Sequence, residues 1–364
     1  VQEVLPPEVK ITRPSTSPHR VTQSSLEVHA VATSRSNHGV RKLRLLIDGR
    51  PYEGRKGVYV VPVVSADTEQ AAQWSIDLPP GSHKLSVLAE TQVSNALSDS
   101  VEVVYSPTTT RDAARLPDLY VLAIGVSEYA GALKLNYAAK DARQLTSTIE
   151  QVSSTLYRNI EVKLLTDKQA TRRSILQGLS WMRREMTQQD VAMFFFSGHG
   201  AKDATGTFYL VPVDGEPQDL MSSAVSGSQF KDALASIPGR VLVLLDACHA
   251  GSAGGDRRKA VYVMTDDLIR DLATDDFGVI VMCSSMGREY SLESDEHQQG
   301  YFTLALIEAL TGKSDFNGDG LVYVTEVDAY LSDRVKSLTE GLQHPVTTKP
   351  ATIRSFPLSQ PIEQ

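Results

Sequence analysis

Two reactive residues follow short apolar runs in this sequence. His199 comes three residues after the end of the run 191–196, and Cys248 comes three residues after the end of the run 241–245. Short, wholly apolar runs are typical of strands in a parallel sheet that is covered on both faces. Ligands bind at the carboxyl ends of such strands. We therefore expect His199 and Cys248 to lie together at that edge of a sheet.

A histidine and a cysteine at one edge could cleave peptide bonds. His199 can take the thiol proton of Cys248, leave a thiolate nucleophile, and then protonate the departing amine. The backbone N–H groups of Gly200 and Cys248 could form an oxyanion hole. A lone cysteine at a strand end is more often a buried small hydrophobic residue. The segments 197–200 and 246–251, each after an apolar run, together indicate a catalytic site far more specifically. His249 is the weaker base, and Cys283, at the end of another apolar run, is predicted to be core.

The elements that must position these residues lie in 118–364, where apolar strands alternate with amphipathic helical patterns. Strands are predicted at 119–126, 160–165, 191–196, 241–245 and 278–283, and helices at 138–152 and 171–186, the second with Thr171 as N-cap. The pattern predicts an α/β domain with a mainly parallel sheet and helices on both faces.

Residues 1–105 are predicted to be all-β. Short alternating or β-branched runs occur at 26–33, 40–47, 58–64, 74–78, 84–90 and 100–105. Asp48-Gly49 is a hairpin signal, and the Pro79-Pro80-Gly81 turn is another break between strands. The spacing favours an immunoglobulin-like β-sandwich without a disulfide. Residues 106–117 have the composition of a linker to the second domain.

Composition excludes several classes of protein. The net charge of −8 over 364 residues argues against a nucleic-acid partner, which requires a basic face. The apolar runs are far too short to span a bilayer, so we expect no membrane partner. Two cysteines cannot form a disulfide framework, which fits a cytoplasmic protein. The chain starts at Val1 without a signal segment, so we expect a trimmed form or a fragment of a longer protein.

From Asp118 to about Pro350 the sequence resembles a caspase-like peptidase domain, of the clan that holds caspases, metacaspases and their bacterial relatives. The strongest motifs are 197–200 and 246–251, and the supporting segments are 120–129, 135–142, 209–214 and 284–293. The separation of His199 and Cys248 is also close to that of caspases. The resemblance implies that His199 and Cys248 are a catalytic dyad for peptide hydrolysis. It does not cover the N-terminal domain.

The sequence departs from true caspases in its specificity residues. Those enzymes cut after Asp, and they need Arg side chains and a Gln two residues before the nucleophile. Here that position is Asp246, and no Arg occurs between residues 128 and 141. The resemblance to metacaspases implies that Asp141, Ser197 and Asp246 line a pocket for Arg or Lys, since an anionic pocket repels Asp. Alternatively, Asp246 orients the loop around Cys248, and Asp141 is a negative charge that stabilises the N-terminus of a helix.

A separate motif, D-x-N-x-D-G-x5-E, starts at Asp315 and matches the loop of an EF-hand. The candidate calcium ligands are Asp315, Asn317, Asp319, Leu321 and Glu326. Helices are predicted on both sides, at 302–310 and 327–338. The alternative is a structural Asp/Gly-rich turn, which is common between helices. The chemistry of the dyad requires no cofactor, so Ca²⁺ would be structural or regulatory.

The segment 251–261 follows the nucleophile and combines flexible glycines with a basic triplet. In the family that the sequence resembles, a chain is often clipped at this place. The triplet Arg257, Arg258 and Lys259 matches the charge expected for an acidic pocket, so we expect self-cleavage there. The alternative is a mobile polar loop whose charges are solvated.

The sequence thus favours a cysteine endopeptidase that cuts after basic residues, with Arg preferred over Lys because only a guanidinium binds a carboxylate through two parallel hydrogen bonds. Its partners would be protein or peptide substrates, with the immunoglobulin-like domain as a docking or regulatory module. The alternative is a binding or scaffold protein whose caspase-like domain senses a partner and cuts nothing.

Overall fold

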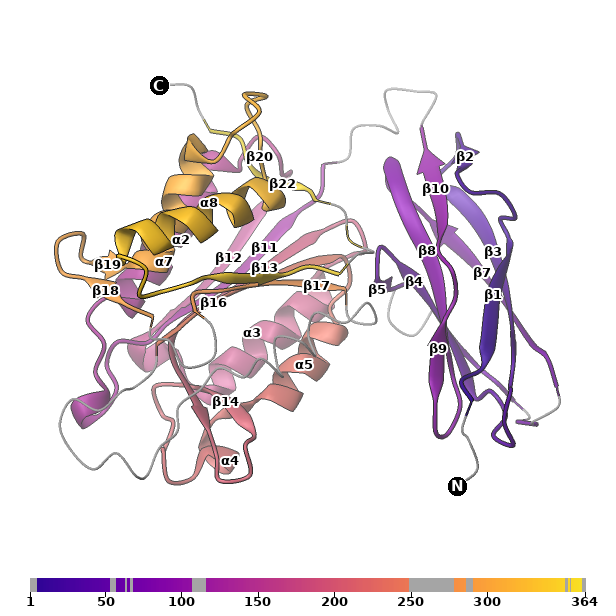
Figure 1. The fold of residues 1–364 in the computed structure, drawn as a ribbon, viewed down its shortest axis with the longest axis horizontal. Helices are drawn as coiled ribbons and strands as arrows, with labels where there is room; N and C mark the ends of the chain where they lie inside the picture. The colour runs from indigo at the N-terminus through magenta and orange to yellow at the C-terminus, as the bar shows by residue number, and fades with distance from the viewer. Residues whose placement is uncertain are drawn as a thin grey trace.

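The computed structural model describes residues 5–52, 57–62, 64–65, 68–106, 116–248, 278–285, 291–350, 353 and 355–361. These residues form two regions, each built on its own sheets (Figure 1). No helix within these ranges is long and apolar enough to cross a membrane.

The N-terminal region consists of strands. They are β1 (Glu8–Arg13), β2 (His19–Val21), β3 (Ser25–Thr33), β4 (Lys42–Ile47), β5 (Arg50–Pro51), β6 (Val58–Val60), β7 (Gln70–Asp77), β8 (Gly81–Glu90), β9 (Asn95–Leu97) and β10 (Val101–Tyr105). One sheet has the order β1-β3-β7; the other has the order β2-β10-β8-β4-β5, with β6 on β4 and β9 on β8. Val28 and Trp74 of the first sheet share a core with Leu43 and Leu85 of the second. The strand-rich prediction is confirmed, while the immunoglobulin-like assignment stays a prediction.

The second region is built around an eight-stranded mixed sheet, counted over the described residues. Its strands are β11 (Leu119–Gly125), β12 (Ile160–Thr166), β13 (Val191–Lys202), β14 (Phe208–Val211), β15 (Val225–Ser226), β16 (Arg240–Cys248), β17 (Val279–Cys283) and β21 (Val346–Thr348). The main order is β12-β11-β13-β16-β17-β21, with β14 attached to β13 and β15 attached to β14. The pairs from β12 through β17 are parallel, as predicted, and the β21 and β14 pairs are antiparallel.

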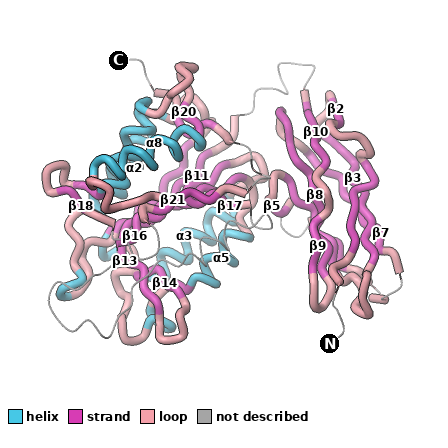
Figure 2. The backbone as a smooth tube through the Cα atoms, in the orientation of Figure 1, coloured by secondary structure: helices cyan, strands magenta, loops and turns pink. Residues whose placement is uncertain are grey.

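Helices cover both faces of this sheet (Figure 2). They are α2 (Ala138–Val152), α3 (Arg172–Glu185), α4 (Leu220–Ser223), α5 (Gly227–Ala235), α7 (Tyr301–Glu308) and α8 (Val324–Leu338). The short helical turns are η1 (Gly131–Leu133), η2 (Asp167–Gln169) and η3 (Ala309–Lys313). Two small two-stranded sheets pair β18 (Glu293–Ser294) with β19 (Gln299–Gly300), and β20 (Val322–Tyr323) with β22 (Pro357–Ser359). Helices α3 and α5 pack into one core, and α2, α7 and α8 into the other. Thr171 caps α3 as predicted, because its hydroxyl accepts the Ser174 N–H.

Two strands run further than the sequence predicted. We predicted strands that end at residues 196 and 245, but β13 continues to Lys202 and β16 to Cys248. The extension of β13 is possible because the antiparallel strand β14 pairs with it, so its backbone groups find partners. Gly198 permits this packing, since a Cβ there would lie 2.6 Å from the hydroxyl of Tyr129.

The two regions meet at the hairpin between β4 and β5. Its two-residue turn has positive φ angles, 51° at Asp48 and 76° at Gly49, as the Asp-Gly signal predicts. Arg50, which is 1% exposed, follows the turn and donates to the backbone carbonyls of Leu234, in the last turn of α5, and of Ile237 and Gly239, just after that helix. This contact lies where β16 and β17 begin, at the edge of the sheet opposite to their carboxyl ends.

Candidate functional site

The backbone brings the predicted dyad together. Strands β13 and β16 are parallel neighbours, and His199 and Cys248 are register partners on them. Adjacent strands lie about 4.8 Å apart, so the two backbones are direct neighbours at this edge. The side chain of Cys248, its neighbour His249 and the segment with Arg257, Arg258 and Lys259 lie outside the described residues.

The imidazole of His199 is held by groups that come before α2 in the chain. Its Nε2 lies 2.6 Å from the carbonyl oxygen of Leu133, and its ring centroid lies 4.4 Å from that of Tyr129. Because a carbonyl can only accept, Nε2 carries the proton in this contact, and in the neutral ring the lone pair is then on Nδ1. The hydroxyl of Tyr129 accepts the backbone N–H of His199 and donates to the carbonyl of Val211.

Gly200 has a packing reason to be glycine. A Cβ at this position would lie 2.8 Å from the ring of Phe208 on the neighbouring strand β14. The chain therefore requires glycine here for its fold alone. The role of its N–H in an oxyanion hole stays a prediction.

Asp141 and Asp246, which we call the acidic pair, are buried close to the dyad. Each is 1% exposed. The carboxylate of Asp246 accepts from the hydroxyls of Ser291 and Thr303, the latter at 2.9 Å. That of Asp141 accepts the backbone N–H of Gly300 at 3.1 and 3.2 Å. These three partners were not found from the sequence.

The end of β11 positions Asp141. A Cβ on Gly125 would lie 2.3 Å from the carbonyl oxygen of Ala138, so glycine lets α2 begin directly against the sheet. The carboxylate of Glu293 accepts the backbone N–H of Tyr137 at 2.9 Å and fixes the same end of the helix. Asp141 then lies in the first turn of α2, as the helix-charge alternative requires, but its carboxylate accepts from the backbone N–H of Gly300.

Ser197, the third predicted residue of the pocket, lies on β13 as the register partner of Asp246. It is 3% exposed. The structure therefore places Ser197 and Asp246 side by side on the two strands that carry His199 and Cys248. Its contact with a substrate stays a prediction.

Burial sets the charge of the acidic pair. Burial first, and then the nearby charge of Asp246, raise the pKa of Asp141 to about 9. Burial also raises the pKa of Asp246, against the hydroxyls of Ser291 and Thr303, which lower it. A buried pair of carboxylates cannot hold two negative charges without a partner, so it binds a proton or a cation.

Cys283 is core, as predicted. It lies at the end of β17, is 0% exposed, and packs with the α3 and α5 core. Burial raises the pKa of its thiol well above the usual range, so this cysteine stays protonated and unreactive.

The predicted calcium loop is held by its own backbone. Asp315 accepts the N–H groups of Gly318 and Gly320, and Glu326 accepts that of Tyr323 at 2.9 Å, which completes a capping box at α8. Within the described part of the chain, no three His, Cys, Asp or Glu side chains converge as a metal site. Asn317, Asp319 and Leu321 belong to the same run of turns. Calcium binding stays a prediction.

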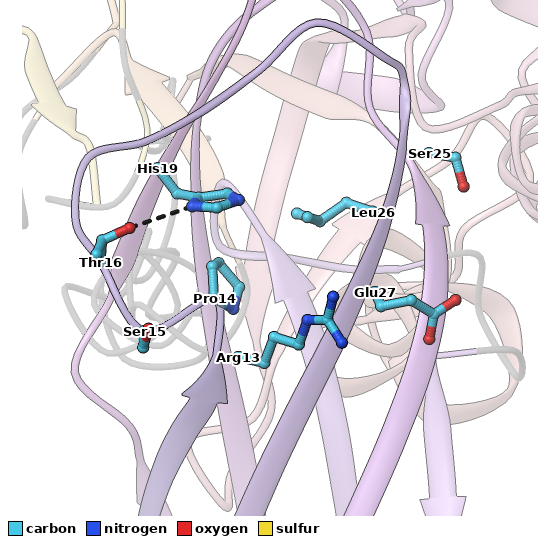
Figure 3. Close-up of a pocket in the computed structure, with 8 residues that line it drawn as sticks. All are labelled: Arg13, Pro14, Ser15, Thr16, His19, Ser25, Leu26 and Glu27. Atoms are coloured by element: carbon cyan, nitrogen blue, oxygen red, sulfur yellow. Dashed lines mark hydrogen bonds between the residues drawn. The ribbon is translucent and has the colours of Figure 1, made fainter.

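A hollow of about 480 Å³ lies elsewhere, in the N-terminal region (Figure 3). Arg13 and Glu27 line it, and Thr16 and His19 form a 3.1 Å hydrogen bond on one side. It shares no residue with the dyad or the acidic pair.

Known proteins resemble parts of this chain. A Metacaspase-1 of Eremothecium gossypii is 27% identical over 174 residues, which are 42% of this chain and 35% of that protein. A Metacaspase-1 of Yarrowia lipolytica is 31% identical over 117 residues, 27% of this chain and 24% of that protein. The chain thus spans about a third or less of the length of these curated relatives. The solved protein GSU0716 from Geobacter sulfurreducens aligns over 64% of this chain and 94% of its own, with 18% identity and a TM-score of 0.46.

The family comparison covers the region that carries the site. Residues 119–356 match the caspase domain, a family of cysteine peptidases, from the start of β11 to the residue before β22. The match includes both strands of the dyad and both members of the acidic pair. The chain belongs to the caspase domain family.

Proposed function

We propose that this protein is a cysteine endopeptidase that cleaves after Arg and, less efficiently, after Lys. Cys248 is the nucleophile and His199 the general base and acid. The observation that carries the proposal is the buried acidic pair: Asp246 lies on β16, the strand of Cys248, and Asp141 lies at the start of α2. True caspase specificity for Asp is incompatible with it, because an Asp side chain would add further negative charge to a buried acidic site.

The reaction follows from the tautomer of His199. Nδ1 takes the thiol proton, and the thiolate attacks the scissile carbonyl carbon while the π electrons move to the oxygen. Nδ1–H then protonates the leaving amine, the C–N bond breaks, and a thioester remains. Water attacks the thioester, gives its proton to Nδ1, and the C–S bond breaks to restore the thiolate. Leu133 keeps the ring oriented through both steps.

Specificity rests on charge and shape. A guanidinium offers five donors in one plane and can bond two carboxylates at once, whereas an ammonium is a point charge with weaker directional preference. The pair Asp141 and Asp246, with Ser197 alongside, suits a guanidinium better than an ammonium. The basic side chain also compensates the buried negative charge, which otherwise requires a bound proton.

The test is a set of peptides that differ only at the residue before the scissile bond: Arg, Lys, Asp and citrulline, the neutral analogue of Arg. We expect cleavage in the order Arg, Lys, then citrulline, and no cleavage after Asp. Cys248→Ala should remove turnover, and Cys283→Ala should retain it. A protein that binds these peptides but cuts none would instead be a scaffold whose domain only senses partners.

We further propose that the chain cuts itself after Arg257, Arg258 or Lys259. A basic segment tethered close to Cys248 in the sequence has a high effective concentration at the site. Intact-mass measurement of the purified protein should find two fragments that meet in 257–259, and only the full chain in Cys248→Ala. An active enzyme that remains one chain on long incubation would disprove self-cleavage and leave the dyad unaffected.

A further inference from the structure

Gly300 has no conformational reason to be glycine. It precedes α7 with φ −66° and ψ 137°, angles that any residue adopts. The position before a helix also favours Ser, Thr, Asp or Asn, whose side chains cap the first turn. Another property of this place must therefore explain the absence of a side chain.

That property is the space around its Cα. A Cβ on residue 300 would lie 2.9 Å from Oδ2 of Asp246, closer than real Cβ atoms pack, and 3.0 Å from Oδ2 of Asp141, tighter than nearly all real Cβ contacts. Both carboxylates therefore press against one backbone position. Their two oxygens lie within about 6 Å of each other, the range in which like charges strongly affect one another's ionisation.

Neither carboxylate can move aside without losing partners. Ser291 and Thr303 hold Asp246, and both hydroxyls are themselves buried. Asp141 is held by the N–H of Gly300 itself. A methyl group at residue 300 would have to displace at least one of these hydrogen-bonded carboxylates in a closely packed interior.

We propose that Gly300 determines the specificity of the acidic pair: its missing side chain lets Asp141 and Asp246 converge, so that one guanidinium meets both. Gly300 acts as a positioning residue, through the two carboxylates and not by contact with the reacting atoms. The inference rests on the proposed cleavage after basic residues. It adds that the selectivity depends on the distance between the carboxylates as well as on their charge.

Gly300→Ala tests the inference, read as the ratio of kcat/KM for the Arg peptide to that for the citrulline peptide. We expect the ratio to fall at least about tenfold, mainly through a higher KM for the Arg peptide. The rate at which iodoacetamide alkylates Cys248 should stay that of the parent, because the dyad is not displaced. Ser226→Ala, which removes the side-chain cap of α5 far from the acidic pair, is the matched control and should keep the parental ratio.

Two further variants separate positioning from general damage. Asp141→Asn should lower the ratio, and adding Gly300→Ala to it should lower the ratio little further, because both changes remove the same joint acceptor. Thr303→Val removes a hydrogen bond to Asp246 and adds no methyl group at residue 300. This variant should also lower the ratio. It therefore provides the test if Gly300→Ala fails to fold. A parental ratio in Gly300→Ala, or in Thr303→Val if the former does not fold, would overturn the inference alone. A parent enzyme with no preference for Arg would overturn the proposed function and the inference together.

Discussion

At the scale of single residues, the sequence predicted the chemically obvious groups and missed those that hold them. His199, Asp246 and Cys248 were singled out because their residue types follow apolar runs, and Asp141 was singled out through the resemblance to metacaspases. The carbonyl of Leu133 and the hydroxyl of Thr303 have no such signal, since each matters only through a contact with a distant segment. These partners depend on tertiary packing, which spacing along the chain does not reveal.

Asp141 also imposes a cost on stability that depends on pH. Its pKa rises from 3.8 in the unfolded chain to about 9 in the folded protein, chiefly through burial. Folding therefore takes up a proton between these values, and the free energy of unfolding falls as pH rises from about 4 to about 9. Lys140, which lowers this pKa, and Glu293, which raises it, are the other charged groups involved.

Asp141→Asn should therefore raise the Tm at pH 8 and leave it nearly unchanged at pH 4. The same variant should lose most of its preference for Arg over citrulline, because one of two carboxylates is gone. Thermal unfolding at the two pH values measures the first effect. An equal gain in Tm at both values would show that the carboxyl group of Asp141 is not buried as described.

At the scale of elements, patterns predicted which strands and helices exist better than where they end. The helix predicted at 138–152 is α2 residue for residue, because its apolar face repeats with the helical period. The extension of β13 to Lys202 was missed because it depends on β14, a strand that the sequence analysis did not identify. Ends set by a partner strand are not local properties of a sequence.

The loop 315–326, which leads into α8, is predicted to bind Ca²⁺. If residues 315–326 bind Ca²⁺, the ion will raise the Tm of the parent, since a ligand of the native state stabilises it by mass action. Glu326→Gln should abolish that rise and change the Tm without calcium little, because glutamine also serves in a capping box. Mg²⁺ is the control ion. Equal Tm values of the parent with and without Ca²⁺ would reduce the loop to a structural turn.

At the scale of the whole molecule, the contact between the two regions could not be predicted. The Asp-Gly signal indicated a hairpin, and the hairpin formed. Nothing in the sequence showed that Arg50 would be buried against carbonyls 184 to 189 residues away. The N-terminal region contacts the second region through this hairpin, where β16 and β17 begin and not at their carboxyl ends (Figure 1).

Arg50→Ala should loosen this contact. It leaves the buried carbonyls of Leu234, Ile237 and Gly239 without their donor, at a cost on the order of 3 kcal/mol. Calorimetry should resolve two unfolding transitions where the parent shows one. Arg41→Ala, which removes an exposed arginine bonded to Gln92, is the control and should unfold like the parent. A single unshifted transition in Arg50→Ala would show that the contact does not couple the regions.

The central claim is that Cys248 attacks a carbonyl while the acidic pair holds a basic side chain. A peptide chloromethyl ketone that ends in Arg tests both parts at once, because the reagent alkylates a nucleophile only where its basic residue binds. Peptide mapping by mass spectrometry should find the adduct on Cys248, none on Cys283, and far slower labelling by the citrulline analogue. An adduct on Cys283, no adduct, or equal rates for the two reagents would contradict the account.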